Sequence, residues 1–234
     1  MSWHINILTL FPEMFPGTLG HSLSGKALEK GAWSYNCIQI RDHAEGTHKC
    51  VDDTPFGGGA GMVMRPDVIE KALSTIKKPG RRIYMSPRGK PLTQDLVKTL
   101  TQEESLTILC GRYEGVDQRL LDAHDFEEIS IGDYVLSGGE PAAMILMDAC
   151  IRLLDGVMGN KATPDEESFS SGLLEYPHYT KPAEWTDTNE ITHHVPDVLR
   201  SGHHKNINTW RLEQSEGLTK QRRPDLWEAY KKRL

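Results

Sequence analysis

Short apolar runs alternate with amphipathic segments along roughly the first two thirds of the chain. The runs are rich in β-branched residues and end at glycine, proline or polar clusters, which is typical of buried strands. The pattern predicts strands at His4–Phe11, Tyr35–Arg41, Arg82–Ser86, Leu106–Cys110 and Glu128–Ile131. We expect the third of these strands to be broken by Pro87-Arg88-Gly89.

The segments between these runs have the spacing of helices. Ser24 precedes 26–30 as a possible N-cap, 66–76 begins with a proline, and Thr93 is suited to cap a helix that ends at Leu100. The segment Pro141–Leu154 is apolar around most of its circumference, so we expect it to be buried against a sheet or a subunit interface. This alternation from residue 4 to 154 favours an α/β domain with a largely parallel sheet.

The remaining segments are polar. Residues 42–62 form a long loop that ends in four glycines, and a loop of this length is usually functional or disordered. We expect an acidic linker over 156–171, between a domain at 1–155 and a small, mostly helical domain at 172–234 with helices at His203–Gln214 and Pro224–Lys232.

Composition narrows the class of protein. The content of 38% hydrophobic and 26% charged residues is ordinary for a cytosolic protein. There is no apolar run of the ~18 residues that span a bilayer and no signal peptide pattern, so we expect a cytoplasmic protein without a membrane anchor. The cysteines are scattered, which argues against a disulfide framework and a zinc knuckle; they are Cys37, Cys50, Cys110 and Cys150.

Charge is unevenly distributed. The net charge is −6, yet residues 200–234 carry nine lysines or arginines against four acids. Such a basic tail on an acidic body suggests an anionic partner for the tail, although a solvated helical face has the same pattern.

Two of the predicted strands end in glycine loops, and these loops suggest a small-molecule site. Gly111-Arg112-Tyr113-Glu114-Gly115 follows one strand, and Gly132 to Glu140 follows the other. Ligands of open α/β sheets bind at the carboxyl ends of the strands, where such loops lie. Glycine lets the backbone approach a ligand closely. The glycines at 57–61 lack the ending of a P-loop and do not complete a dinucleotide fingerprint, so we do not expect a nucleotide-hydrolysing site.

Other motifs carry less chemistry. The pairs His193-His194 and His203-His204 lack the spacing of a zinc site, and no G-x-S-x-G sequence supports a serine hydrolase. Acids at 165–167 are either solvated charge or a general base on a mobile segment. Arg152, the one basic group of an apolar helix, needs an anionic or carbonyl partner.

Several stretches together resemble the bacterial tRNA (guanine-N1)-methyltransferases, the TrmD family. The likeness is carried in order by 52–62 (DDTPFGGGAGM), 84–87 (YMSP), 111–117 (GRYEGVD), 130–136 (SIGDYVL), 138–140 (GGE), 172–182 (GLLEYPHYTKP) and 195–199 (VPDVL). It extends from about residue 4 to the end of the chain. One such motif would be weak, but the ordered series is specific.

The resemblance implies a homodimer of the SPOUT class, with a parallel sheet threaded into a deep trefoil knot, a topology that sequence reasoning would not propose. It implies S-adenosylmethionine as methyl donor and N1 of guanosine 37 of tRNA as acceptor. The family is reported to need Mg²⁺, but we find no ligand cluster that identifies a metal site.

The resemblance also implies roles for particular residues. The donor is expected to contact Tyr84, Met85, Ser86, Pro87, Gly111, Tyr113, Glu114, Gly115, Ser130, Ile131, Gly132, Asp133, Tyr134, Val135, Leu136, Gly138 and Gly139. The tRNA is expected to contact Gly57, Gly58, Gly59, Ser168, Arg222 and Arg223.

Catalysis is expected from two further residues. Glu167 stands where the family has an aspartate and is expected to be the general base; Asp165 or Glu166 can share that role. Arg152 is expected to stabilise charge on O6 of the guanine. The chain also lacks the residue that the family has between Glu140 and Pro141, and it stops sooner than many relatives.

Three alternatives stay open. The chain can be a SPOUT methyltransferase that acts on another RNA guanosine, or an RNA-binding protein that lost its base through the change at 167. A dinucleotide-binding oxidoreductase is the most distant, because the sequence lacks its fingerprint.

Overall fold

A computed structural model describes residues 2–158, 168–169 and 171–233 of the 234 residues. The chain divides into two compact units, Met1–Gly159 (unit 1) and Asn160–Leu234 (unit 2). Each unit is described by itself.

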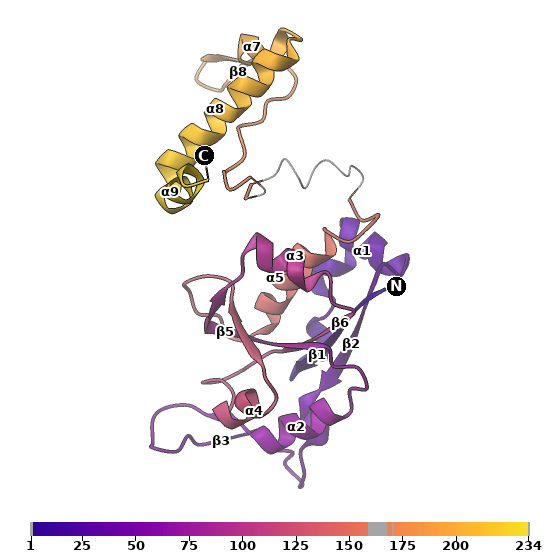
Figure 1. Ribbon diagram of the computed structural model, residues 1–234. Helices are drawn as coiled ribbons and strands as arrows, with labels where there is room; N and C mark the ends of the chain where they lie inside the picture. Colours follow the sequence, from indigo (N-terminus) through magenta and orange to yellow (C-terminus); the bar gives the residue numbers. More distant parts are fainter. Residues whose placement is uncertain (1, 159–167, 170, 234) are drawn as a thin grey trace. The chain divides into compact units, whose positions relative to one another are not determined.

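Unit 1 is built on a parallel sheet, as the alternating pattern predicts (Figure 1). Within the described residues the strand order is β2-β1-β6-β5-β7, and every neighbouring pair is parallel. The strands are β1 (Trp3–Thr9), β2 (Trp33–Gln39), β5 (Arg81–Pro91), β6 (Ser105–Leu109) and β7 (Glu127–Ser130). The mixed α/β fold with a central parallel sheet is therefore confirmed.

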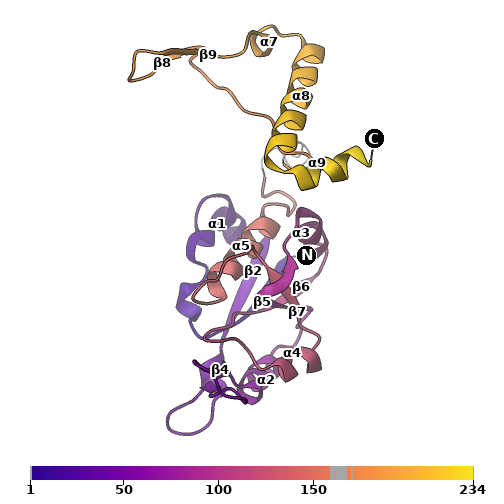
Figure 2. The ribbon, with the colours of Figure 1, turned by 90° about the vertical axis from the view of Figure 1, so that its left-hand side faces the viewer.

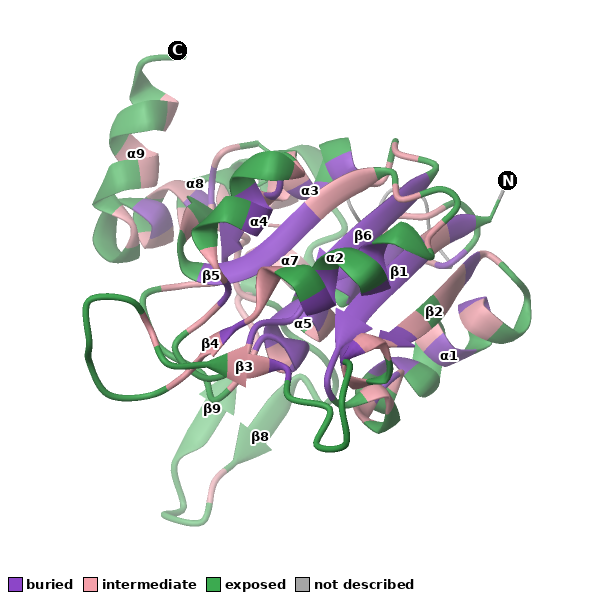
Figure 3. Cartoon of the chain, turned by 90° about the horizontal axis from the view of Figure 1, so that it is seen from below, coloured by how far each residue is buried: buried purple, intermediate pink, exposed green. Residues whose placement is uncertain are grey.

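Both faces of this sheet are covered, which explains why its strands are apolar runs and not alternating ones. Ile5 and Ile7 of β1 face one apolar cluster, and Leu8 faces the other. The first cluster lies under α1 (Ser22–Glu29), α3 (Gln94–Leu100) and α5 (Glu140–Ile151); the second lies under α2 (Pro66–Ser74), α4 (Gln118–Ala123) and the 3-10 turn η3 (Ile40–His43). Figure 3 shows the central strands as the buried layer of the unit.

The apolar helix predicted at 141–154 is α5, which lies between α1 and α3 (Figure 2). Its expected burial is confirmed: apolar side chains along most of its length are buried, and the list comprises Ala142, Ala143, Leu146, Met147, Cys150 and Ile151. The helix ends at Ile151, earlier than expected, with Arg152 as its C-cap.

Two local predictions were wrong. Strand β5 is not broken at Pro87, because Ile129 of β7 pairs with both Met85 and Lys90, so that the intervening residues form a bulge. The bulge requires Gly89, since a Cβ there would lie 2.4 Å from the backbone of Glu128. Ser24 is not an N-cap: the N-cap of α1 is His21, whose carbonyl accepts a hydrogen bond from the Ser24 hydroxyl. Thr93, by contrast, caps α3 as predicted by accepting from the Leu96 amide.

The long loop after β2 is partly ordered by pairing. Two short antiparallel strands, β3 (Asp52–Asp53) and β4 (Val63–Met64), close its glycine-rich half. Two 3-10 turns, η1 (Pro12–Met14) and η2 (Gly17–Gly20), lead from β1 to α1.

Unit 2 contains more than helices. Its elements are a hairpin of β8 (Glu184–Thr186) and β9 (Thr192–His194), then α7 (Asp197–Arg200), α8 (His204–Arg222) and α9 (Pro224–Lys231). Helix α8 continues eight residues beyond the predicted Gln214, because Gly217 is tolerated and the first strong stop is Pro224. The hairpin escaped prediction because its strands are short and polar.

Candidate active site

The bulged part of β5 and the loops that follow β6 and β7 surround a cavity of about 220 Å³. It lies at the carboxyl ends of parallel strands, where ligands of open α/β sheets bind. Every residue predicted to contact a donor lines it except Asp133; those lining it are Tyr84, Met85, Ser86, Pro87, Gly111, Tyr113, Glu114, Gly115, Ser130, Ile131, Gly132, Tyr134, Val135, Leu136, Gly138 and Gly139. The cavity is also lined by Arg112, Ile129, Ser137 and Ala142, which sequence reasoning did not select.

Glycines bring the two loops into backbone contact. The Gly139 amide donates to the Gly111 carbonyl at 2.9 Å. A Cβ on Gly139 would lie 2.8 Å from Cα of Cys110, and one on Gly111 would lie 2.8 Å from the Tyr84 ring. Side chains are therefore excluded at these positions, and the wall of the cavity there is backbone.

The loop from Ile131 to Gly138 presents backbone donors. The Ser130 hydroxyl fixes its start, accepting from the Gly132 amide at 3.2 Å and donating to the Gly132 carbonyl at 3.1 Å. Gly132 has a φ of +144°, which favours glycine. Within the described residues no acceptor is found for the amides of Val135, Leu136 and Gly138, so they can donate to a ligand.

A buried ion pair stands behind the cavity wall. Glu140, fully buried, accepts from the Thr9 hydroxyl at 2.7 Å, and its Oε2 lies 2.9 Å from a guanidinium nitrogen of Arg112. Arg112 also donates to the Ser137 carbonyl at 3.3 Å and lies 4.3 Å above the Phe11 ring. The pair joins the end of β1 to both loops.

The two tyrosines of the cavity differ in environment. Burial raises the pKa of Tyr84, so its hydroxyl stays neutral at physiological pH. Tyr113 is half exposed at the rim together with Tyr134 and the more exposed Val135. An apolar rim around a backbone-lined cup suits a flat aromatic ligand.

The glycine-rich loop is anchored beside this cavity. The Glu114 amide donates to the Met62 carbonyl, and the Met64 amide donates to the Gly115 carbonyl at 2.9 Å. The predicted tRNA-contacting glycines Gly57, Gly58 and Gly59 are exposed at the tip, each with a positive φ.

Arg152, one of the two expected catalytic residues, is not brought to the cavity of the same chain. Arg152 follows the end of α5, whereas Gly139 at its start lines the cavity. The twelve residues of α5 separate them by about 18 Å at 1.5 Å per residue. The neighbours of Arg152 confirm this: residues 153–155 line a second hollow with Ser2 and Trp3, at the start of β1.

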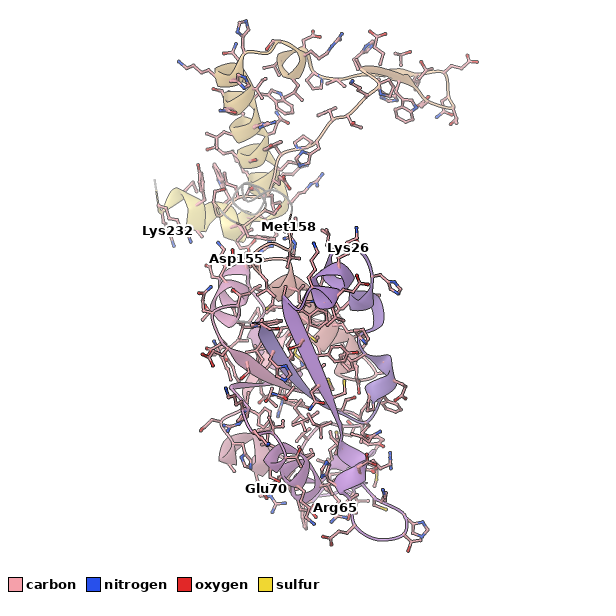
Figure 4. The ribbon with its side chains drawn as sticks, turned by 90° about the vertical axis from the view of Figure 1, so that its right-hand side faces the viewer. Lys26, Arg65, Glu70, Asp155, Met158 and Lys232 are labelled. Atoms are coloured by element: carbon pink, nitrogen blue, oxygen red, sulfur yellow. The ribbon has the colours of Figure 1, made fainter. Side chains whose placement is uncertain are left out.

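Figure 4 shows residues near Arg152 and residues near the cavity loop at opposite ends of unit 1. Asp155 and Met158 lie at one end of unit 1, and Arg65 and Glu70 lie at the other. Arg65 directly follows Met64, which is bonded to the cavity loop.

The remaining predicted residues lie in unit 2 or outside the described residues. The Ser168 hydroxyl accepts from the Glu175 amide at 3.0 Å. Arg222 is exposed at the end of α8, and Arg223 forms an ion pair with Asp225 at 2.6 Å. Glu167, Asp165 and Glu166 lie outside the described residues.

Two features are absent from the described residues. They contain no group of three or more His, Cys, Asp or Glu residues arranged to hold a metal ion. None of the helices that they form is long and apolar enough to cross a bilayer.

Known proteins are similar in sequence to this chain over nearly its full length. The family model described as tRNA (Guanine-1)-methyltransferase TrmD matches residues 3–229. A tRNA (guanine-N(1)-)-methyltransferase of Brucella ovis is 57% identical over 228 residues, which is 97% of this chain and 92% of the relative. Its counterparts in Brucella suis and Brucella abortus are also 57% identical, over 91% of their length. The chain therefore belongs to the TrmD family of tRNA (guanine-1)-methyltransferases.

Proposed function

We propose that this protein methylates N1 of guanosine 37 in tRNA, next to the anticodon, with S-adenosylmethionine as the methyl donor. The observation that carries the proposal is the glycine-walled cavity at the bulge of β5 and the ends of β6 and β7. The chain that holds it is 57% identical, over 228 residues, to a methyltransferase named for tRNA guanine N1. Membership of the TrmD family supports methyltransferase activity, and the cavity supports the proposed location of the donor.

The cavity fits the donor by its chemistry. An adenine ring has a flat apolar face and polar edges, which match the apolar rim and the free amides of Val135, Leu136 and Gly138. Gly111 and Gly139, where a Cβ has no room, leave backbone groups as the wall of the cavity. When bound, S-adenosylmethionine supplies an electrophilic methyl group on a sulfonium.

Guanine N1 must lose a proton as the methyl arrives, so a base has to lie on the acceptor side. We assign this role to Glu167, and we assign stabilisation of charge on O6 to Arg152. Since Arg152 lies about 18 Å from the cavity of its own chain along α5, the site requires a second copy that contributes its Arg152 and linker. This supports a homodimer with composite sites.

The sheet order supports the SPOUT knot. Strand β6 follows β5 in the sequence but lies between β1 and β5, and Gly139 of a later segment packs on the backbone of Cys110. We propose that residues 1–155 form the knotted catalytic domain and that 156–171 link it to a tRNA-binding domain at 172–234.

Contacts to tRNA are assigned to both units. The exposed glycines 57–59 beside the cavity allow close approach of an RNA backbone. In unit 2, Arg222 is exposed and is suited to contact a phosphate. Arg223 forms an ion pair with Asp225, and the Ser168 hydroxyl accepts a hydrogen bond from the Glu175 amide. We assign no residue to Mg²⁺. The reaction belongs in the cytoplasm, where tRNA is modified.

The test uses the purified protein with methyl-labelled S-adenosylmethionine and two tRNA transcripts that differ only in guanosine or adenosine at position 37. Label in the first alone, mapped to N1, is the expected result. Label in both transcripts would assign the enzyme to another RNA guanosine. Label in neither, with measurable donor binding, would favour an RNA-binding protein without catalysis and would direct attention to Glu167.

A further inference from the structure

The buried pair of Arg112 and Glu140 is not explained by packing alone. Glu140 has no exposed surface, and the desolvation of a buried carboxylate and guanidinium can cost as much free energy as their attraction returns. An apolar pair of similar volume would pack as well. The position of the pair, directly behind the donor cavity, suggests what it does.

Arg112 helps to position the loop that follows β7. It lines the cavity and donates to the Ser137 carbonyl, and its Nε lies 2.4 Å from where a Cβ on Gly138 would be. The guanidinium therefore supports the loop that carries the free amides. A lone positive charge in this place, however, would repel a sulfonium ligand.

Glu140 supplies the opposite charge. Its carboxylate faces the Arg112 guanidinium, accepts from the Thr9 hydroxyl and lies in the first turn of α5, whose dipole attracts negative charge. Oε2 lies 2.9 Å from the arginine without hydrogen-bond geometry to it, and the Arg112 Nε has no partner among the described residues. The contact between the two residues is thus chiefly electrostatic.

The charges around the cavity indicate whether it favours a cationic or a neutral ligand. Of the residues that line it, only Arg112 and Glu114 are charged. With Glu140 behind Arg112, two acids stand against one base, so the surroundings of the cavity carry a net charge of −1. That charge complements a sulfonium and gives no advantage to a neutral thioether.

We propose that Glu140 is a specificity-determining residue: it neutralises Arg112, and so lets the cavity prefer the sulfonium donor over the thioether product of the same shape. The inference rests on the proposed function, since it takes S-adenosylmethionine as the ligand. It concerns the ratio of two affinities, which a merely structural role of Glu140 would leave unchanged.

The test measures the dissociation constants of S-adenosylmethionine and S-adenosylhomocysteine by calorimetry on the full-length protein. Glu140→Gln keeps the shape and an acceptor for Thr9, and it should weaken the sulfonium ligand on the order of ten-fold more than the thioether. Arg112→Gln should shift the ratio in the opposite direction. The double variant should return the ratio toward that of the unsubstituted protein.

Glu127→Gln is the matched control. Glu127 pairs with Arg81 at 2.6 Å and does not line the cavity, so its substitution should leave the ratio unchanged. Circular dichroism checks that each variant is folded. Should Glu140→Gln fail to fold, the shift expected for Arg112→Gln still decides the matter.

Equal weakening of both ligands by Glu140→Gln, or an unchanged ratio in Arg112→Gln, would overturn the inference while the unsubstituted protein still methylates tRNA. Failure of the unsubstituted protein to bind either ligand would instead overturn the proposed function, and the inference with it.

Discussion

Gly139 offers the sharpest test of how the cavity is built. Its φ of −78° is open to any residue, so a substitution there acts through space and not through backbone strain. In Gly139→Ala the new Cβ would lie 2.8 Å from Cα of Cys110 and 3.0 Å from the Gly111 amide nitrogen. Both neighbours are backbone atoms of the loop on the far wall, and neither can rotate away.

The magnitude follows from this geometry. An ordinary contact for a Cβ begins at 3.4 Å, so the two loops must separate by roughly half an ångström, which also stretches the bond from the Gly139 amide to the Gly111 carbonyl. Overpacking of this kind costs about 1–3 kcal/mol of folding free energy, or about 2–12 °C in Tm for a chain of this size. Displacement of a binding wall by this much should lower methyl transfer by about ten- to a hundred-fold.

The assay combines thermal unfolding with donor titration and single-turnover methylation. Gly217→Ala is the matched control, because Gly217 lies inside α8 with nothing within 4 Å of its Cβ position; it should gain about 0.5–1 kcal/mol in folding free energy. Full stability and donor affinity in Gly139→Ala would refute the argument that close backbone approach shapes the cavity.

Three further predictions concern other parts of the chain. If Arg152 serves the partner's cavity, co-refolding Gly139→Ala chains with Arg152→Ala chains, each nearly inactive alone, should restore up to about a quarter of normal turnover. Half of the dimers are then mixed, and each mixed dimer holds one intact site of two. No recovery would contradict the composite site. Burial raises the pKa of Cys150 to about 12 and that of Cys37 to about 11. The unfolded chain therefore releases these protons first as pH rises above about 8.5, and the folding free energy measured by urea titration should fall by about 1.4 kcal/mol per pH unit for each thiol. Cys150→Ala should make that decline shallower, and an identical slope would argue against the buried thiol. Arg222→Ala should reduce the salt dependence of tRNA binding by a slope of about 0.7–0.9, whereas Arg222→Lys should preserve it; equal slopes in both would exclude a phosphate contact at this position.

The sequence by itself determined the parallel α/β architecture and the location of the cavity. Strands that are buried on both faces must be continuously apolar, and the loops must contain glycine where their backbone forms the wall of the cavity. Both features can therefore be recognised in short stretches of sequence. The ordered motifs then identified the family, which the comparisons confirm.

Only the tertiary structure decided the rest, because it depends on residues that are distant in sequence. Strand β5 runs through Pro87 because β7 offers it a bulged register, and no local pattern records that partner. Thr9, Arg112 and Glu140 come together only when parallel pairing aligns the ends of β1 and β6 beneath the start of α5. The length of α5 likewise places Arg152 away from the cavity of its own chain. Local sequence determines which segments form helices and strands. Which charged side chains lie together depends on how the chain packs these elements.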